Sequence, residues 1–276
     1  MGGIGNQMFQ YAAGRRLALK HKTILKLDLT FLLDRTPLEN FTYRDYALDA
    51  FNIQENFFNP TENNICRIEQ KLKPMNSINE PHFYFWESML CAPDDSYLNG
   101  YWQSEKYFKD VEDIIRNEFT VKLKADGLNK KLAEEINTCE AVSLHVRRGD
   151  YASNPVTNKY HGLCSLDFYQ KALKKITSCT ENPHFFIFSD EPEWAQENLN
   201  FKHPFKFVTR NGAEKSYEDL RLMSMCKHHI IANSSFSWWG AWLSEYQKKI
   251  IIAPRRWFNN DNLSTIDLIP EGWIKV

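Results

Sequence analysis

The chain has 276 residues, of which 43% are hydrophobic and 25% are charged, and its formal net charge is −1. This composition is typical of a globular protein with one large or two medium domains, and the near-neutral charge argues against nucleic-acid or polybasic membrane binding. No apolar run approaches the roughly 18 residues of a membrane-spanning helix, and no signal peptide opens the sequence, so we expect a cytoplasmic protein. The six cysteines are scattered without a Cys-x-x-Cys pair, which favours free thiols over a zinc site or a disulfide framework.

The N-terminal part opens on a glycine-rich segment that runs into an apolar helical pattern over residues 8–18. We expect Gly5, Asn6 and Gln7 to lie in a loop at the helix N-terminus, where backbone N–H groups can bind an anion or a sugar hydroxyl. The segment differs from the dinucleotide-binding fingerprint, because the third glycine and a preceding strand are absent.

The rest of the N-terminal part has few clean periods. Strands are predicted over residues 23–27 and 97–102, and helices over 107–119 and 125–137. The stretch between residues 30 and 100 is irregular and rich in aromatic residues, and we predict only short strands and loops there.

The C-terminal half alternates strands with helices, which is the pattern of a parallel sheet with helices on both faces. Strands are predicted over residues 141–146, 185–188, 205–208, 229–232 and 250–252. Helices are predicted over residues 165–176, 192–199, 217–226 and 238–243, with Ser165 and Ser216 as N-caps. We therefore divide this α/β chain into an N-terminal domain, residues 1–130, and a C-terminal domain, residues 131–276.

Two adjacent arginines follow the first strand of the C-terminal domain. Arg147 and Arg148 are followed by a glycine and Asp150, and then by a segment with Asn154 and Pro155 that we predict to be an irregular loop. Each guanidinium offers a fork of donors that matches phosphate or carboxylate, so anion binding is one interpretation. The alternative is a salt-bridged surface turn in which Asp150 pairs with one arginine.

Polar residues also follow two other strands of this sheet. Asp190 comes after the second strand and suits hydrogen bonds from a base or ribose; its alternative role is an N-cap. Asn233, Ser234, Ser235 and Ser237 follow the fourth strand, either as phosphate ligands or as an ordinary N-cap cluster. Because the carboxyl ends of parallel strands meet at one edge, the three strand ends together favour a diphosphate site.

Four motifs resemble those of the α-1,2-fucosyltransferases of glycosyltransferase family 11. They are Gly-Gly-Ile-Gly-Asn-Gln-Met-Phe-Gln-Tyr-Ala at 2–12, His-Val-Arg-Arg-Gly-Asp-Tyr at 145–151, Phe-Ser-Asp-Glu at 188–191 and Ala-Asn-Ser-Ser-Phe-Ser-Trp-Trp-Gly-Ala-Trp-Leu at 232–243. The resemblance covers essentially the whole chain. It implies two facing Rossmann-like domains of the GT-B type, with the donor site in the C-terminal domain and the cleft, and with the N-terminal domain, including the aromatic stretch between residues 30 and 100, on the acceptor side. The family usually carries a short apolar strand before the glycine-rich segment, so we expect the first strand to be missing here.

The resemblance also implies roles for particular residues. Arg147 is expected to contact the β-phosphate of the donor, with Arg148 and Tyr151 in the substrate site. The sequence contains no Asp-x-Asp signature of metal-dependent transferases, so we expect arginine to supply the cation and no metal to be needed. Asp150 is the first candidate for the general base and His145 the second. The alternatives are a salt bridge that orients Arg147 and a buried histidine that steadies the strand or touches the guanine.

The expected function is inverting transfer of L-fucose from GDP-fucose to the 2-hydroxyl of a terminal galactoside in a glycan. The expected partners are GDP-fucose and a galactose-terminated acceptor, without nucleic acid, and with peripheral association at the inner membrane face where glycans are assembled. Two alternatives stay open: a transferase that uses another nucleotide sugar, and an inactive nucleotide- or carbohydrate-binding relative.

Overall fold

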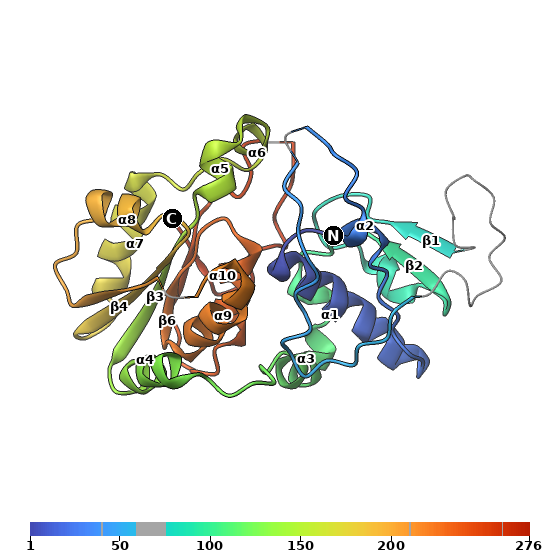
Figure 1. The fold of residues 1–276 in the computed structure, drawn as a ribbon, viewed down its shortest axis with the longest axis horizontal. Helices are drawn as coiled ribbons and strands as arrows, with labels where there is room; N and C mark the ends of the chain where they lie inside the picture. The colour runs from blue at the N-terminus through green and yellow to red at the C-terminus, as the bar shows by residue number, and fades with distance from the viewer. Residues whose placement is uncertain (40, 59–75, 210, 261) are drawn as a thin grey trace. The chain divides into compact units, whose positions relative to one another are not determined.

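The computed structural model describes residues 1–39, 41–58, 76–209, 211–260 and 262–276 (Figure 1). The chain forms two compact units. The first consists of Met1–Lys122 and Leu263–Pro270, and the second of Leu123–Asn262 and Glu271–Val276. The predicted domain boundary at residues 130 and 131 falls inside a helix that belongs wholly to the second unit.

The second unit contains a six-stranded sheet in which every neighbouring pair is parallel, as the alternating pattern predicted. Its strands are β3 (Glu140–Val146), β4 (Pro183–Ser189), β5 (Phe205–Val208), β6 (His228–Ile230), β7 (Ile251–Ala253) and β8 (Ile274–Lys275). The spatial order is β5-β4-β3-β6-β7-β8, which is the order of a doubly wound nucleotide-binding sheet. The direction of winding changes between β3 and β6, and ligands bind at such a switch point in sheets of this type.

The register of β3 against β4 brings two predicted site residues together. The strands pair along their whole length and end with Val146 opposite Ser189. The next residues, Arg147 and Asp190, therefore leave the sheet side by side, although 42 residues separate them along the chain.

Helices cover both faces of this sheet, while α5 and α6 lie beyond the carboxyl end of β3 (Figure 1). The helices of this unit are α4 (Gly127–Asn137), α5 (Gly149–Ser153), α6 (Pro155–His161), α7 (Leu166–Thr177), α8 (Pro192–Asn198), α9 (Ser216–Met225) and α10 (Ser235–Leu243), with the 3₁₀ turn η4 (Ala213–Lys215). Alternate residues of β4 face the two layers, because side chains of a strand point to opposite faces. Phe185 and Ile187 pack in the cluster that contains α7, while Phe186 and Phe188 pack with residues of α4 and α9.

Several helices of the second unit begin or end at residues other than the predicted ones. Ser165 caps α7 as predicted, since its Oγ accepts a hydrogen bond from the Phe168 N–H at 3.2 Å. The prediction for Ser216 is wrong, because Ser216 is the first residue of α9 and Lys215 occupies the cap position without a side-chain bond. The segment after Arg148, predicted as an irregular loop, forms α5 and α6, because the Asn154 side chain accepts from the first N–H groups of α6.

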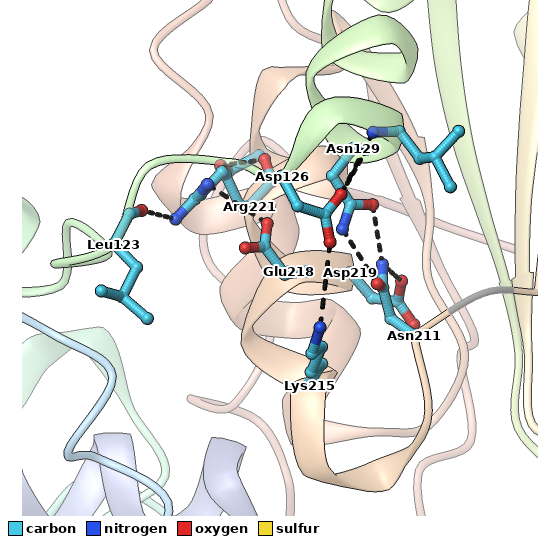
Figure 2. A network of polar contacts seen from close by, with 10 residues as sticks. Leu123, Asp126, Asn129, Asn211, Lys215, Glu218, Asp219 and Arg221 are labelled. Carbon is cyan, nitrogen blue, oxygen red and sulfur yellow. Dashed lines mark hydrogen bonds and ion pairs between the residues drawn. The ribbon is translucent and has the colours of Figure 1, made fainter.

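A polar network connects α4 with α9 and the segment before it (Figure 2). Asn129 and Asn211 exchange two hydrogen bonds, at 3.0 and 3.1 Å, and Asn211 Nδ2 also donates to Asp219 Oδ1 at 2.8 Å. Burial raises the pKa of Asp219 to about 7, against an ordinary value of 3.8. The network therefore holds a carboxyl group that titrates near neutral pH.

The first unit contains the elements α1 (Ile4–His21), α2 (Thr30–Leu33), α3 (Glu112–Glu118), β1 (Asn76–Asn79) and β2 (Ser96–Asn99), and the 3₁₀ turns η1 (Glu87–Cys91), η2 (Glu105–Tyr107) and η3 (Lys109–Val111). Strands β1 and β2 form a parallel pair. The strand predicted over 23–27 is wrong: of these residues only Leu27 forms an isolated bridge, with Phe57, and Ile24 is 64% exposed.

Helix α1 contains the predicted helix and extends it in both directions. Its first turn closes on Gly3, whose carbonyl accepts from the N–H groups of Asn6 and Gln7. Gly5, Asn6 and Gln7 therefore lie inside the helix, and the prediction that they form a loop before it is wrong. The predicted helix over 107–119 is broken into η3 and α3, with a 3₁₀ turn before them.

Two expectations on the whole chain can be compared with the described residues. Cys91, Cys139, Cys164, Cys179 and Cys226 are free thiols, while Cys66 lies outside the described residues. Within the described part of the chain, no helix combines the length and apolar character that crossing a membrane requires.

Candidate functional site

Arg147 lies between two carboxylates at the carboxyl end of β3. Its Nη1 lies 2.8 Å from Asp190 Oδ2, and its Nη2 lies 2.5 Å from Asp150 Oδ1. Burial lowers the pKa of Arg147, but Asp190 and Asp150 outweigh this effect and raise the pKa above its ordinary value. The guanidinium is thus held charged and oriented, with 23% of its side chain exposed.

Asp190 contacts the turn formed by Arg147, Arg148 and Gly149, here called the arginine turn, with both carboxylate oxygens. Oδ1 accepts from the Arg148 N–H at 2.8 Å, while Oδ2 pairs with Arg147. A Cβ atom at Gly149 would lie 2.6 Å from Asp190 Oδ2, so the close approach of this carboxylate requires a glycine. In the structure, Asp190 therefore holds the arginine turn in place. The sequence analysis had predicted hydrogen bonds to Asp190 from a base or ribose.

Arg148 interacts with a different carboxylate from those that bind Arg147, and also with an aromatic ring. Its Nε donates to Glu191 Oε2 at 2.8 Å, and its guanidinium lies 4.0 Å from the ring centroid of Trp194. The sequence analysis did not assign either partner to the site. Glu191 follows Asp190 directly, and Trp194 lies in the first turn of α8. Both residues are close in sequence to a predicted strand end, and this closeness could have identified them as site residues.

His145 is a buried residue of β3. Its Nδ1 is buried and has no hydrogen-bond partner among the described residues, and its ring lies 5.7 Å from that of Phe236. Burial, with a smaller effect of Arg147, lowers the pKa of His145 to about 3. A histidine with this pKa stays neutral at physiological pH and is a weak proton acceptor.

Tyr151 lies against the arginine turn in α5. The Arg147 guanidinium is 5.2 Å from its ring centroid, and the ring stacks on His161 with 4.4 Å between centroids. His161 is a site neighbour that the sequence analysis missed, because the segment that carries it was read as an irregular loop. Burial lowers the pKa of His161 to about 4, with opposing smaller effects of Asp150 and Arg147.

The Asn233 side chain forms hydrogen bonds with backbone carbonyls of other segments of the chain. Its Nδ2 donates to the carbonyls of His161, Gly162 and Trp257 at 3.0, 3.3 and 3.1 Å, and its Oδ1 accepts from the Cys164 thiol at 3.4 Å. The side chain is almost fully buried. These contacts assign Asn233 to anchoring the end of α6, rather than to direct contact with a ligand.

The serines after β6 begin helix α10. Ser235 is its first residue, Ser234 precedes it, and Ser237 Oγ donates to the Ser234 carbonyl at 3.3 Å. Because β6 pairs with β3, this helix start follows the strand next to the one that carries the arginines, across the switch point of the sheet. A helix start supplies backbone N–H groups that favour an anion.

The glycine-rich motif belongs to the first unit. Gln7 Nε2 donates to the carbonyls of Gly2 and Asp45 at 2.9 and 2.8 Å, and its Oε1 accepts from the Ala47 N–H at 3.0 Å. Asn6 Oδ1 accepts from Gln103 Nε2 at 2.8 Å, and Gly5 is buried in α1. Gln7 thus fastens the segment at 45–47 to α1.

The described residues contain no group of three or more His, Cys, Asp or Glu side chains that could hold a metal ion. The absence of a metal requirement stays a prediction.

The family model described as glycosyl transferase family 11 matches residues 2–276. The chain is 35% identical to an α-1,2-colitosyltransferase of Escherichia coli, over the whole chain and 96% of that protein. It is 33% identical to the O-antigen biosynthesis glycosyltransferase WbnK of Escherichia coli, over the whole chain and 98% of that protein. It is 29% identical to galactoside α-(1,2)-fucosyltransferase 1 of Rattus norvegicus, over 53% of the chain and 41% of that protein. A crystal structure of NodZ α-1,6-fucosyltransferase soaked with GDP-fucose aligns over 86% of the chain and 88% of its own, with a TM-score of 0.48 and 14% identity.

Proposed function

Because the chain belongs to glycosyl transferase family 11, we propose that it transfers L-fucose from GDP-fucose to the 2-hydroxyl of a terminal galactoside, with inversion and without a metal. The observation that carries the donor assignment is Arg147, held between Asp150 and Asp190 at the switch point of a doubly wound sheet. We assign the donor to the second unit and the acceptor glycan to the first.

The proposed role of Arg147 is to stabilise the leaving group. Breaking the bond between the sugar and the diphosphate adds negative charge to the β-phosphate, and a cation already in position lowers the barrier without reorganisation. Asp150 and Asp190 hold the guanidinium from two sides, so its orientation is set before the donor binds. Arg148, braced by Glu191 and Trp194, supports the same turn.

We propose other roles for the two residues that the sequence suggested as the general base. Asp150 forms an ion pair with Arg147, with Oδ1 2.5 Å from Nη2, so we assign Asp150 to positioning Arg147. The low pKa of His145 argues against that residue as the base.

A second candidate donor comes from the relatives. The α-1,2-colitosyltransferase matches the whole chain, whereas the galactoside α-(1,2)-fucosyltransferase of rat matches 53% of it. This supports colitose as an alternative sugar on the same site. The O-antigen relative supports a role in polysaccharide biosynthesis, for which we propose peripheral association with a membrane-bound glycan assembly.

The test is a donor and acceptor panel. The protein is incubated with GDP-fucose, GDP-colitose, GDP-mannose or UDP-galactose and with galactose-terminated sugars, and the new linkage is assigned by NMR. We expect an α-1,2 linkage with GDP-fucose. Preference for GDP-colitose would select the second candidate, and binding of every donor without transfer would identify an inactive relative.

A further inference from the structure

The imidazole of His161 stacks on the ring of Tyr151, and that ring also contacts the guanidinium of Arg147. The His161 and Tyr151 rings are nearly parallel, with an angle of 11° between their planes and 4.4 Å between their centroids. The Arg147 guanidinium lies over the Tyr151 ring, 5.2 Å from its centroid. All three residues belong to the second unit. The Tyr151 ring is therefore a further contact of the guanidinium, besides the carboxylates of Asp150 and Asp190.

Two other aromatic rings fix the orientation of the His161 imidazole. The Tyr160 ring meets it edge-on with 4.9 Å between centroids, and the Phe258 ring lies 5.5 Å away at an angle of 44°. Tyr160 and Phe258 also contact each other, with 5.2 Å between centroids. Aromatic pairs favour tilted and edge-on arrangements at such separations. Phe258 lies in the segment after β7, so rings from a second strand end set the plane on which Tyr151 stacks.

The backbone on both sides of His161 is held by two asparagines. Asn233, which follows β6, donates from Nδ2 to the carbonyls of His161 and Gly162 at 3.0 and 3.3 Å. The Asn259 N–H donates to the Tyr160 carbonyl at 2.9 Å. Gly162 has a φ of 68°, and a Cβ atom there would lie 2.4 Å from Asn259 Oδ1, so this close approach requires a glycine. The end of α6 is therefore fixed to the segments that follow β6 and β7.

The His161 side chain interacts with its neighbours as a neutral ring. Burial lowers the pKa of His161 to about 4, so the imidazole is uncharged near pH 7 and adds no positive charge beside Arg147. Its Nδ1 is buried and forms no hydrogen bond with any residue that the structure describes. Stacking is thus the contact that His161 offers to Tyr151, and a phenyl group can reproduce it.

We propose that His161 is a positioning residue of the transfer reaction, which holds the Tyr151 ring against Arg147 and so keeps the guanidinium oriented toward the β-phosphate of the donor. The inference rests on the proposed function. Arg147 stabilises the developing charge only if its N–H groups point to it, and a displacement of about 1 Å can lower a rate by a factor of about a hundred. The stack connects Arg147, at the end of β3, with the ends of β6 and β7 on the other side of the switch point.

The test replaces His161 with phenylalanine, which keeps the stack, and with leucine, which fills the space without an aromatic ring. We expect His161→Phe to retain kcat within about threefold, and His161→Leu to lower kcat by about tenfold or more with a smaller change in KM for GDP-fucose. The matched control is His203→Leu, because His203 is a partly buried histidine of the same unit whose ring contacts Phe185. His203 precedes β5 and so lies at the opposite edge of the sheet, and its replacement should leave kcat unchanged.

A double-mutant cycle shows whether His161 acts through Tyr151. Tyr151→Leu removes the ring on which the imidazole stacks, so His161→Leu should lower kcat by less than about twofold in that background. If His161→Leu is not soluble, His161→Asn, which also lacks an aromatic ring, takes its place.

Three results would overturn the inference. They are losses that multiply in the double variant, equal losses in His161→Phe and His161→Leu, and a kcat of His161→Leu near that of wild type. Melting temperatures of all variants are measured alongside, because a merely structural His161 predicts a lower melting temperature with independent, multiplying losses. Failure of the wild-type protein to transfer any sugar would instead refute the proposed function.

Discussion

Replacement of Arg147 by lysine tests whether the charge or the shape of this side chain matters. The guanidinium reaches Asp190 with Nη1 at 2.8 Å and Asp150 with Nη2 at 2.5 Å. The single ammonium of lysine is a point charge and cannot reproduce this fork, so one carboxylate loses its partner. Loss of one preorganised donor to the developing charge costs about 3 kcal/mol of transition-state stabilisation, a factor of about a hundred or more in kcat. We therefore expect Arg147→Lys to fail nearly as badly as Arg147→Ala.

The assay measures kcat and KM for GDP-fucose, with melting temperatures of all variants. Turnover should fall more than donor affinity, because the interaction strengthens as the bond to the diphosphate breaks. Arg148→Lys is the matched control, and its effect should be smaller, since Arg148 is braced by Glu191 and Trp194. If Arg147→Ala is soluble, melts normally and still transfers at a near wild-type rate, the assignment of Arg147 is wrong.

Three further outcomes are expected. Transfer should survive EDTA, because arginine takes the place of a metal; loss of activity that manganese or magnesium restores would contradict this. Asp219 has a pKa of about 7 in the folded state against an ordinary 3.8, so its contribution to stability is full below 3.8 and is lost as the pH rises to about 7. Asp219→Asn should therefore be more stable than wild type at pH 8, by at most about 4 kcal/mol in urea unfolding, and should show no advantage at pH 4. Asn233→Asp removes donors to three backbone carbonyls in a buried position and should lower the free energy of unfolding by about 2 kcal/mol or more; an unchanged unfolding curve would show that these bonds are dispensable.

The elements that the sequence predicted correctly carry local signals. The segments 141–146 and 185–188 became β3 and β4, because strands buried on both faces are rich in apolar residues, here interrupted only by Ser143 and His145. Ser165 predicted the start of α7, since a cap acts within three residues. The run at 23–27 has a similar composition but formed only a bridge at Leu27, because strand formation depends on a neighbour that composition does not specify.

The sequence by itself determined the parallel sheet of the second unit, the arginines at a strand end and, through four motifs, the family. The sequence also made the ion pair of Arg147 with Asp150 predictable, since the two residues lie three apart along the chain. Only the tertiary structure decided that Asp190 braces the same guanidinium, because the register of β4 against β3 sets that contact. The same holds for the stacking of His161 on Tyr151 and for the hydrogen bond from the Trp102 N–H to Glu80 Oε1. Contacts of this kind depend on how distant segments pack, and no local pattern of residues encodes them.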